Sequence, residues 1–389
     1  MPARNFSRRF SLFYSCLFLG AGAQLPFLPL WLSSKGLDAA DIGLILAAQM
    51  ASRALGAPLG AYVADVTGAR KWVMIVCAVV GCILTAGLSL MQGFWPLFAL
   101  AALSTVVLSP VFPLGEAAAV EGSVIHGLDY GRMRLWGSLS FAAGVLGGGG
   151  ALQVLDIVWV VPLIALGQGL LALACFVLPA EQPADMTAVE PGSGSWRIFG
   201  SATFLLFIAA ASLGQSSHAV LYGFSALHWD HAGYQKTTIA LFWSTSIAAE
   251  VLFFAFSKRA AALLGGIGLI VLGTGMGILR WPLLTIDLPM AAILLVQLLH
   301  AFTFGALHLG AMVFIQDAVP QRLRNTAQGL NAAIVGGIAL SLATWAAGPL
   351  FATLGGRAYL VMAALSVAAF GCALWLKRLH LRPVALNRS

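Results

Sequence analysis

Residues 10–32 read FSLFYSCLFLGAGAQLPFLPLWL, a run of 23 residues without a charged side chain. About 20 consecutive apolar residues are enough for an α-helix to cross the hydrocarbon core of a bilayer. Arg8 and Arg9 precede the run, and Ala21 to Ala23 resemble a signal-peptidase site, but the apolar stretch continues beyond that point. The stretch therefore predicts a retained membrane-spanning helix.

The composition of the whole chain agrees with this first segment. Of its 389 residues, 60% are hydrophobic and only 9% are charged, whereas soluble domains contain about 25% charged residues. So few charges cannot cover a water-exposed surface of this size, so the apolar residues are expected to face the lipid bilayer. The five cysteines lie inside apolar runs without metal-ligand spacing, and we expect no metal and no cofactor.

Twelve apolar segments are long enough to span a membrane, six on each side of a polar break. The sequence predicts an all-α integral membrane protein, with twelve transmembrane helices in two pseudo-symmetric six-helix bundles. The polar stretch 180–196 is rich in Pro, Gly and Ser and is predicted to be a cytoplasmic linker between bundles 1–179 and 197–389. The predicted spans are 10–32, 42–64, 72–91, 94–115, 135–155, 158–178, 199–221, 237–256, 263–279, 288–315, 327–350 and 358–376.

The lysine and arginine residues predict the orientation. If the N-terminus is cytoplasmic, sixteen of the 21 lie on the cytoplasmic side, four lie on the outer side, and Arg53 lies inside the second span. Because cytoplasmic loops are enriched in these residues, we expect a multi-pass protein of the inner (cytoplasmic) membrane with both termini in the cytoplasm. The same bias explains the net charge of +7 without a nucleic-acid partner.

A short repeat relates the two halves of the chain. Gly36 and Ile42 follow the first span, and Gly233 and Ile239 follow the seventh at an offset of 197 residues. The same offset relates Arg53 to Glu250. Because duplicated bundles bind solutes between their repeats, we expect both residues to face a central cavity that binds a small molecule.

Other ionisable residues also lie within or at the ends of predicted spans. A charge inside a span is costly by a few kcal/mol and usually faces a cavity or a partner. His300 and His308 lie on the tenth span, and histidine can exchange protons near neutral pH. Packing histidines, buried ion pairs and, for Arg280, a side chain that reaches the interface are the alternative interpretations.

Residues 61–71 read AYVADVTGARK, which resembles the Gly-x-Leu-Ala-Asp-x-x-Gly-Arg-Arg signature of the major facilitator superfamily. The resemblance implies that Asp65, Gly68, Arg70 and Lys71 form a cytoplasmic gate. The antiporter signature, a Gly-Pro pair in the fifth span, is missing from the glycine run 144–150, which favours symport.

Two further segments, PLGEA at 113–117 and YGRMRLWG at 130–137, resemble the group that contains 3-phenylpropionate permease and lactose permease, an oligosaccharide:proton symporter. This resemblance implies that Glu116 and Arg134 bind substrate, with Glu250 near a further binding glutamate. It also implies that Arg280 and His300 belong to a proton-coupling network.

One position departs from the lactose permease pattern. The proton-carrying carboxylate of that permease is replaced by Thr303, so Glu250, Glu116, His300 or His308 must carry the proton if transport is proton-coupled.

The function predicted from the sequence is secondary active transport, as a monomer, of a small organic acid of the phenylpropionate type with protons. Arg53 or Arg134 would hold the carboxylate, because a guanidinium group matches its geometry. The alternative is a sugar or oligosaccharide symporter that uses Glu116, Arg134 and Glu250. A membrane-embedded enzyme is disfavoured, because no His-x-x-x-x-Asp or similar catalytic spacing occurs.

Overall fold

The computed structural model describes residues 2–179 and 196–381 of the chain, which fold into helices without a single strand. Short 3-10 segments and two π-helical segments, Ala301–Ala306 and Ala332–Ala339, interrupt or join the α-helices. In the first half of the chain the helices are α1 (Ala3–Ser34), α2 (Ala39–Thr67), α3 (Arg70–Gly87), α4 (Phe94–Leu108), α5 (Val111–His126), α6 (Tyr130–Val154) and α7 (Val160–Val177). In the second half they are α8 (Trp196–Phe199), α9 (Ala202–Ser216), α10 (Ala219–His231), α11 (Lys236–Ala255), α12 (Ser257–Leu283), α13 (Met290–Leu298), α14 (Leu307–Ala318), α15 (Arg324–Asn331), α16 (Leu340–Leu354) and α17 (Tyr359–Leu381).

Eleven helical segments of the described chain are long and apolar enough to cross a membrane. The last of them, Thr326–Leu379, is 54 residues long, more than two passes of about 20 residues require. A 3-10 turn at Gly355–Ala358 divides it into α16 and α17, and Gly355 has a φ of +54°. Because the last segment contains two spans, the eleven segments correspond to the twelve predicted spans. The predicted all-α membrane fold is confirmed.

The fourth span is longer than the predicted 94–115. It extends from Phe94 to His126 as α4 and α5, with a break at Pro110, which has no backbone N–H to donate. The predicted span ends at Gly115, immediately before Glu116, whose carboxylate is costly in lipid. In the folded chain that carboxylate accepts hydrogen bonds from tyrosine side chains, so the helix continues past it.

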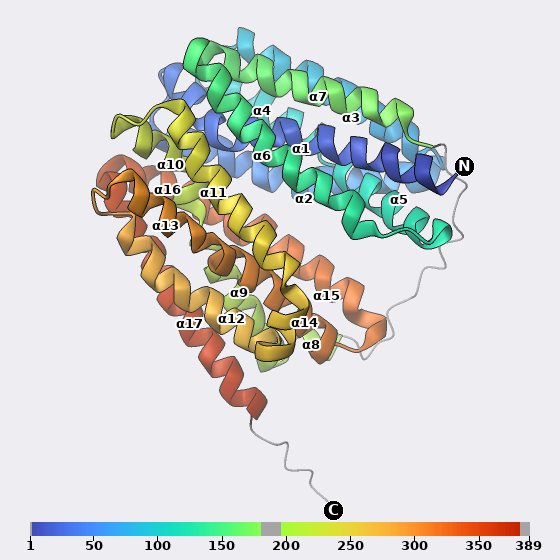
Figure 1. Ribbon diagram of the computed structural model, residues 1–389, viewed down its shortest axis with the longest axis vertical. Helices are drawn as coiled ribbons and strands as arrows, with labels where there is room; N and C mark the ends of the chain where they lie inside the picture. Colours follow the sequence, from blue (N-terminus) through green and yellow to red (C-terminus); the bar gives the residue numbers. More distant parts are fainter. Residues whose placement is uncertain (1, 180–195, 382–389) are drawn as a thin grey trace, which may run out of the picture. The chain divides into compact units, whose positions relative to one another are not determined.

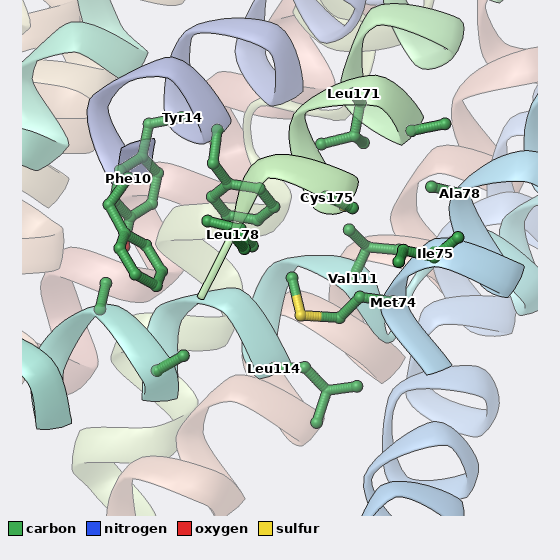
Figure 2. Close-up of a cluster of buried hydrophobic side chains, with 14 of the residues drawn as sticks. Phe10, Tyr14, Met74, Ile75, Ala78, Val111, Leu114, Leu171, Cys175 and Leu178 are labelled. Carbon is green, nitrogen blue, oxygen red and sulfur yellow. The ribbon is translucent and has the colours of Figure 1, made fainter. Parts of the chain in front are cut away.

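The described helices group into two compact units. The first contains the described residues of Met1–Asp185 together with Leu221–Ser244 and Thr344–Gly355. In Figure 1 its helices α1 to α7, coloured blue to green, run side by side. Its core lies where α1, α3, α5 and α7 meet, and Figure 2 shows Phe10, Tyr14, Val111 and Cys175 among the buried side chains there.

The second unit contains the described residues of Met186–Val220, Thr245–Ala343 and Gly356–Ser389. Its helices α9, α12, α14 and α17 pack against one another. Phe207 of α9 stacks on Phe314 of α14 with ring centroids 4.4 Å apart, and both rings are buried. Aromatic stacking thus fixes α9 against α14 in this core.

Two segments from the second half of the sequence belong to the first unit because they pack closely on its helices. A Cβ atom added to Gly43 of α2 would lie 2.8 Å from the Cα atom of Gly348 in α16. A Cβ atom added to Gly149 of α6 would lie 2.7 Å from the carbonyl oxygen of Lys236 at the start of α11. Only glycine allows such close backbone approach. The predicted linker 180–196 lies outside the described residues except for Trp196, and the predicted division into bundles 1–179 and 197–389 stays a prediction.

Candidate functional site

A cavity of about 510 Å³ lies within the first unit, in the size range of small-molecule binding sites. Its walls come from the helices α1 to α7, and most of the lining side chains are apolar. Two of the predicted substrate-binding residues, Arg53 of α2 and Arg134 of α6, line this cavity. No Asp or Glu among the described residues lines it.

The two guanidinium groups of the cavity are not neutralised by carboxylates. Within residues 2–179 and 196–381, neither Arg53 nor Arg134 forms an ion pair. The guanidinium carbon of Arg134 lies 4.3 Å from the ring centroid of Phe18 and 5.5 Å from that of Tyr14, a cation–π arrangement that orients it without removing its charge. The cavity therefore attracts anions.

Glu116 of α5 does not line the cavity, and tyrosines surround its carboxylate. The hydroxyl group of Tyr14 donates to its Oε2 atom at 3.0 Å, and the hydroxyl group of Tyr130 donates to its Oε1 atom. Arg134 stacks over the ring of the same Tyr14. The predicted partners Glu116 and Arg134 are thus linked through Tyr14, and the direct sugar-binding role of Glu116 stays a prediction.

In the second unit, Arg280 is the centre of a buried polar network. Its side chain is fully buried, and its Nη2 atom donates to Oε1 of Gln297 at 2.7 Å. Its Nη1 atom donates to Oγ1 of Thr303 at 2.8 Å and to Nδ1 of His300 at 3.0 Å. A buried guanidinium group is tolerated only with such partners. The alternative in which Arg280 reaches the membrane interface is therefore wrong.

The network assigns the hydrogen positions on His300. Because arginine can only donate, Nδ1 of His300 must be the acceptor, and the ring hydrogen is therefore on Nε2. That Nε2 atom lies 3.6 Å from Oε2 of Glu250 in α11. The structure thus brings three predicted proton-coupling residues together: Arg280, His300 and Glu250.

His218, which the sequence predicts either to line the cavity or to hydrogen-bond a neighbouring helix, completes the network through a contact of the second kind. It is fully buried at the break between α9 and α10, where its Nδ1 atom lies 3.3 Å from the carbonyl oxygen of Gln215 and its Nε2 atom 3.2 Å from Oγ1 of Thr303. With hydrogen on Nδ1, the Thr303 hydroxyl accepts from Arg280 and donates to His218. The sequence signal for this residue is the polar run Gln215-Ser-Ser-His218 inside an apolar span.

His308 lies at one end of an aromatic column. The rings of His300 and Phe304 are 5.3 Å apart and nearly parallel, and Phe304 is 5.8 Å from the parallel ring of His308. The π-helical segment Ala301–Ala306 carries Phe304 and Thr303, and such segments occur often at functional sites. His308 itself is exposed, unlike His300.

The predicted gate residues lie at the junction of α2 and α3. Gly68 ends α2 in the left-handed region, with a φ of +63°, and Asp65 is exposed in the last turn of that helix. Nη1 of Arg70 lies 2.9 Å from Oε2 of Glu121 in α5, and Nζ of Lys71 donates to the carbonyl oxygen of Leu178 at 2.6 Å. The basic residues thus tie this junction to α5 and to the end of α7.

Comparison with known proteins gives consistent results across the chain. Residues 7–361 match the model of the MFS_1 like family. The chain is 31% identical over 375 residues to the probable 3-phenylpropionic acid transporter of Escherichia coli (strain K12), covering 93% of this chain and 96% of that protein. It is 27% identical over 341 residues to the maltose permease of Geobacillus stearothermophilus, covering 85% of this chain and 84% of the permease.

Solved structures show the same fold at low sequence identity. The nucleoside transporter NupG superimposes with a TM-score of 0.82 at 18% identity, covering 96% of this chain and 99% of that chain. The D-xylose–proton symporter superimposes with a TM-score of 0.70 at 16% identity, covering 95% of this chain and 97% of that chain. The match to the family model and the 31% identity to a transporter over most of both chains confirm the predicted resemblance to the permease group and the prediction of a transporter rather than an enzyme. The chain belongs to the MFS_1 like family and is a membrane transporter of the major facilitator type.

Proposed function

We propose that this protein carries a small organic acid of the phenylpropionate type, together with a proton, across the inner membrane. The observation that carries the proposal is the pair of guanidinium groups, Arg53 and Arg134, which line an otherwise mostly apolar cavity without a carboxylate partner. A carboxylate supplies the missing charge. The apolar wall, which includes the edge-to-face rings of Phe18 and Phe112 6.0 Å apart, suits an aromatic body.

The proton is carried by Glu250. A proton added to His300 at Nδ1 would displace the hydrogen bond from Arg280, whereas the Glu250 carboxylate can take a proton without breaking that bond. Its side chain is 25% exposed, which leaves a path for proton exchange. Arg280 and His300 act by orienting the carboxylate, and His308 and Glu116 are not required as carriers.

In the transport cycle, bundles 1–179 and 197–389 rearrange so that the binding site is accessible from each side of the membrane in turn. The protein acts as a monomer. Both termini lie in the cytoplasm, as the distribution of lysine and arginine residues predicts. Arg70 and Lys71 stabilise the junction of α2 and α3 in one of the two states, as a cytoplasmic gate.

A sugar symporter is the second candidate, and the similarity to the maltose permease favours it. The test is uptake by proteoliposomes that contain the purified protein. We expect labelled 3-phenylpropionate to enter and the external medium to become alkaline as it does so, whereas galactosides and maltose are not taken up. Uptake of the sugars but not of the acid would overturn the proposal, and acid uptake without alkalinisation would indicate facilitated diffusion.

A further inference from the structure

Two tyrosine hydroxyl groups hold the carboxylate of Glu116 outside the cavity. Tyr14 of α1, which is fully buried, donates to one carboxylate oxygen at 3.0 Å, and Tyr130 at the start of α6 donates to the other. The two rings meet edge to face, with centroids 6.5 Å apart and an interplanar angle of 82°. Hydrogen bonds to an ionised carboxylate are roughly twice as strong as those between neutral groups. We call these two residues the tyrosine pair.

Arg134 lies close to the same carboxylate without pairing with it. Its guanidinium carbon is 5.5 Å from the centroid of the Tyr14 ring, whose hydroxyl group binds Glu116. Arg134 also follows Tyr130 by four residues, which places both side chains on one face of α6. Opposite charges attract one another more strongly here than in bulk water. Nevertheless, the described part of the chain contains no ion pair between Glu116 and Arg134.

The guanidinium group of Arg134 is held in its own position by packing. It lies 4.3 Å from the ring centroid of Phe18 in α1. A Cβ atom added to Gly137, about one turn further along α6, would lie only 2.8 Å from Nη1 of Arg134. The missing side chain of Gly137 therefore provides the space that the guanidinium group occupies. From this position Arg134 lines the cavity.

Resting on the proposed function, we propose that the tyrosine pair determines the specificity of the cavity for an anionic substrate. Its two hydroxyl groups keep the Glu116 carboxylate from neutralising Arg134, so that the guanidinium group stays available for the carboxylate of the ligand. Without these hydroxyl groups, Glu116 loses both donors that bind it within the described residues. It then pairs with Arg134, because a guanidinium group matches the geometry of a carboxylate.

Two ligands of similar shape but different charge separate this effect from a general loss of structure. 3-Phenylpropionate is an anion at neutral pH, whereas 3-phenylpropionamide is neutral. Competition from Glu116 weakens binding of the anion alone, because only the anion depends on the charge of Arg134. A distorted cavity weakens binding of both ligands. The informative quantity is therefore the ratio of the two Kd values.

The test measures both Kd values by calorimetry for the purified full-length protein and its variants. Because a hydrogen bond to a charged group contributes more than one to a neutral group, we expect wild type to bind the acid about tenfold more tightly than the amide. Tyr14→Phe combined with Tyr130→Phe should remove most of this preference by weakening the acid alone. Adding Glu116→Gln should restore the preference, because the competing charge is gone. Tyr62→Phe, which removes an exposed hydroxyl group of α2 outside the cavity, is the matched control and should keep the wild-type ratio.

Each outcome supports or overturns the role of the tyrosine pair. If wild type does not bind the acid, the proposed function is wrong and the specificity role fails with it. If wild type binds the acid but the double variant keeps the preference, or if Glu116→Gln does not restore it, only the specificity role is overturned. Equal weakening of both ligands overturns it as well, because that result indicates a structural role. Should the double variant not fold, Tyr130→Phe alone must lower the preference and Glu116→Gln must restore it.

Discussion

Gly36 and Gly233 lie 197 positions apart and have the same backbone φ of +84°. The backbone N–H of Gly36 donates to the carbonyl oxygen of Ser33, and that of Gly233 donates to the equivalent oxygen of Asp230. The bonds from Leu37 to Leu32 and from Tyr234 to Trp229 repeat in the same way. The short similarity between the two halves therefore corresponds to one loop conformation that is used twice.

Alanine at either glycine should destabilise the protein by a similar amount. No atom lies within 4 Å of a Cβ added at Gly36 or Gly233, so the cost comes from the left-handed backbone alone, about 1–2 kcal/mol. Thermal unfolding of purified Gly36→Ala and Gly233→Ala should show equally lowered Tm values. Gly147→Ala is the control, because that position in α6 is also unobstructed but has no positive φ, and its Tm should not fall. Unequal losses at the two glycines would argue against equivalent loops.

Removal of either cavity guanidinium should weaken binding of the acid. A hydrogen bond to a charged group contributes about 1.5–3 kcal/mol, so Arg53→Gln and Arg134→Gln should each raise the Kd for 3-phenylpropionate about tenfold to a hundredfold. Binding measured by calorimetry checks this. Arg132→Gln changes an exposed residue of the same helix as Arg134, outside the cavity, and should leave the Kd unchanged. Equal effects of all three substitutions would indicate a nonspecific charge effect.

Glu250→Gln should separate substrate movement from proton movement. The amide cannot exchange a proton, so the variant should lose accumulation driven by a pH gradient and the accompanying alkalinisation of the medium. Exchange of labelled for unlabelled acid across the vesicle membrane should continue, because that reaction needs no net proton transfer. Asp287→Asn, an exposed carboxylate between α12 and α13, is the control. Normal accumulation by Glu250→Gln would exclude Glu250 as the proton carrier.

The hydroxyl group of Thr303 should couple Arg280 to His218. Thr303→Val keeps the shape but leaves both neighbours with one partner fewer, at a cost of about 1–3 kcal/mol. Thr303→Ser should retain most of the stability. In a double-mutant cycle with His218→Phe, measured by thermal unfolding, the two losses should be non-additive by about 0.5–3 kcal/mol. Additive losses would show that the observed contact has no energetic importance.

Transport of one carboxylate with one proton moves no net charge. A membrane potential contributes about 2.3 kcal/mol per elementary charge per 100 mV, so an electroneutral cycle should not respond to it. We expect uptake to follow an imposed pH gradient and to be unchanged by a potassium diffusion potential. A strong response to voltage would indicate a different stoichiometry or an uncharged substrate.

The helices were predictable because a membrane span depends on local composition. The exceptions are places where a distant partner changes the local preference. The fourth span continues past Glu116 because Tyr14, 102 residues earlier in the chain, donates to its carboxylate. The π-helical segment Ala301–Ala306 was also not predicted, since hydropathy is similar for α- and π-helical backbones.

The candidate site was predictable only in part. The resemblance to the permease group indicated Arg280 and His300, which are in contact. It paired Glu116 with Arg134, whereas in this chain Tyr14 lies between them. The role of His218 depends on a contact with Thr303 across 85 residues, which no periodicity or spacing reveals. Long-range side-chain contacts of this kind become visible only once the helices are packed.

The lack of carboxylates around Arg53 and Arg134 also affects the carrier when no substrate is bound. Two positive charges in a largely apolar cavity repel sodium, potassium and hydronium ions, as arginine does in other selective pores. In the proposed transport cycle, the cell's ion gradients would consequently not dissipate through the substrate-free protein. The groups that we propose to attract the acid would thus also exclude cations between transport cycles.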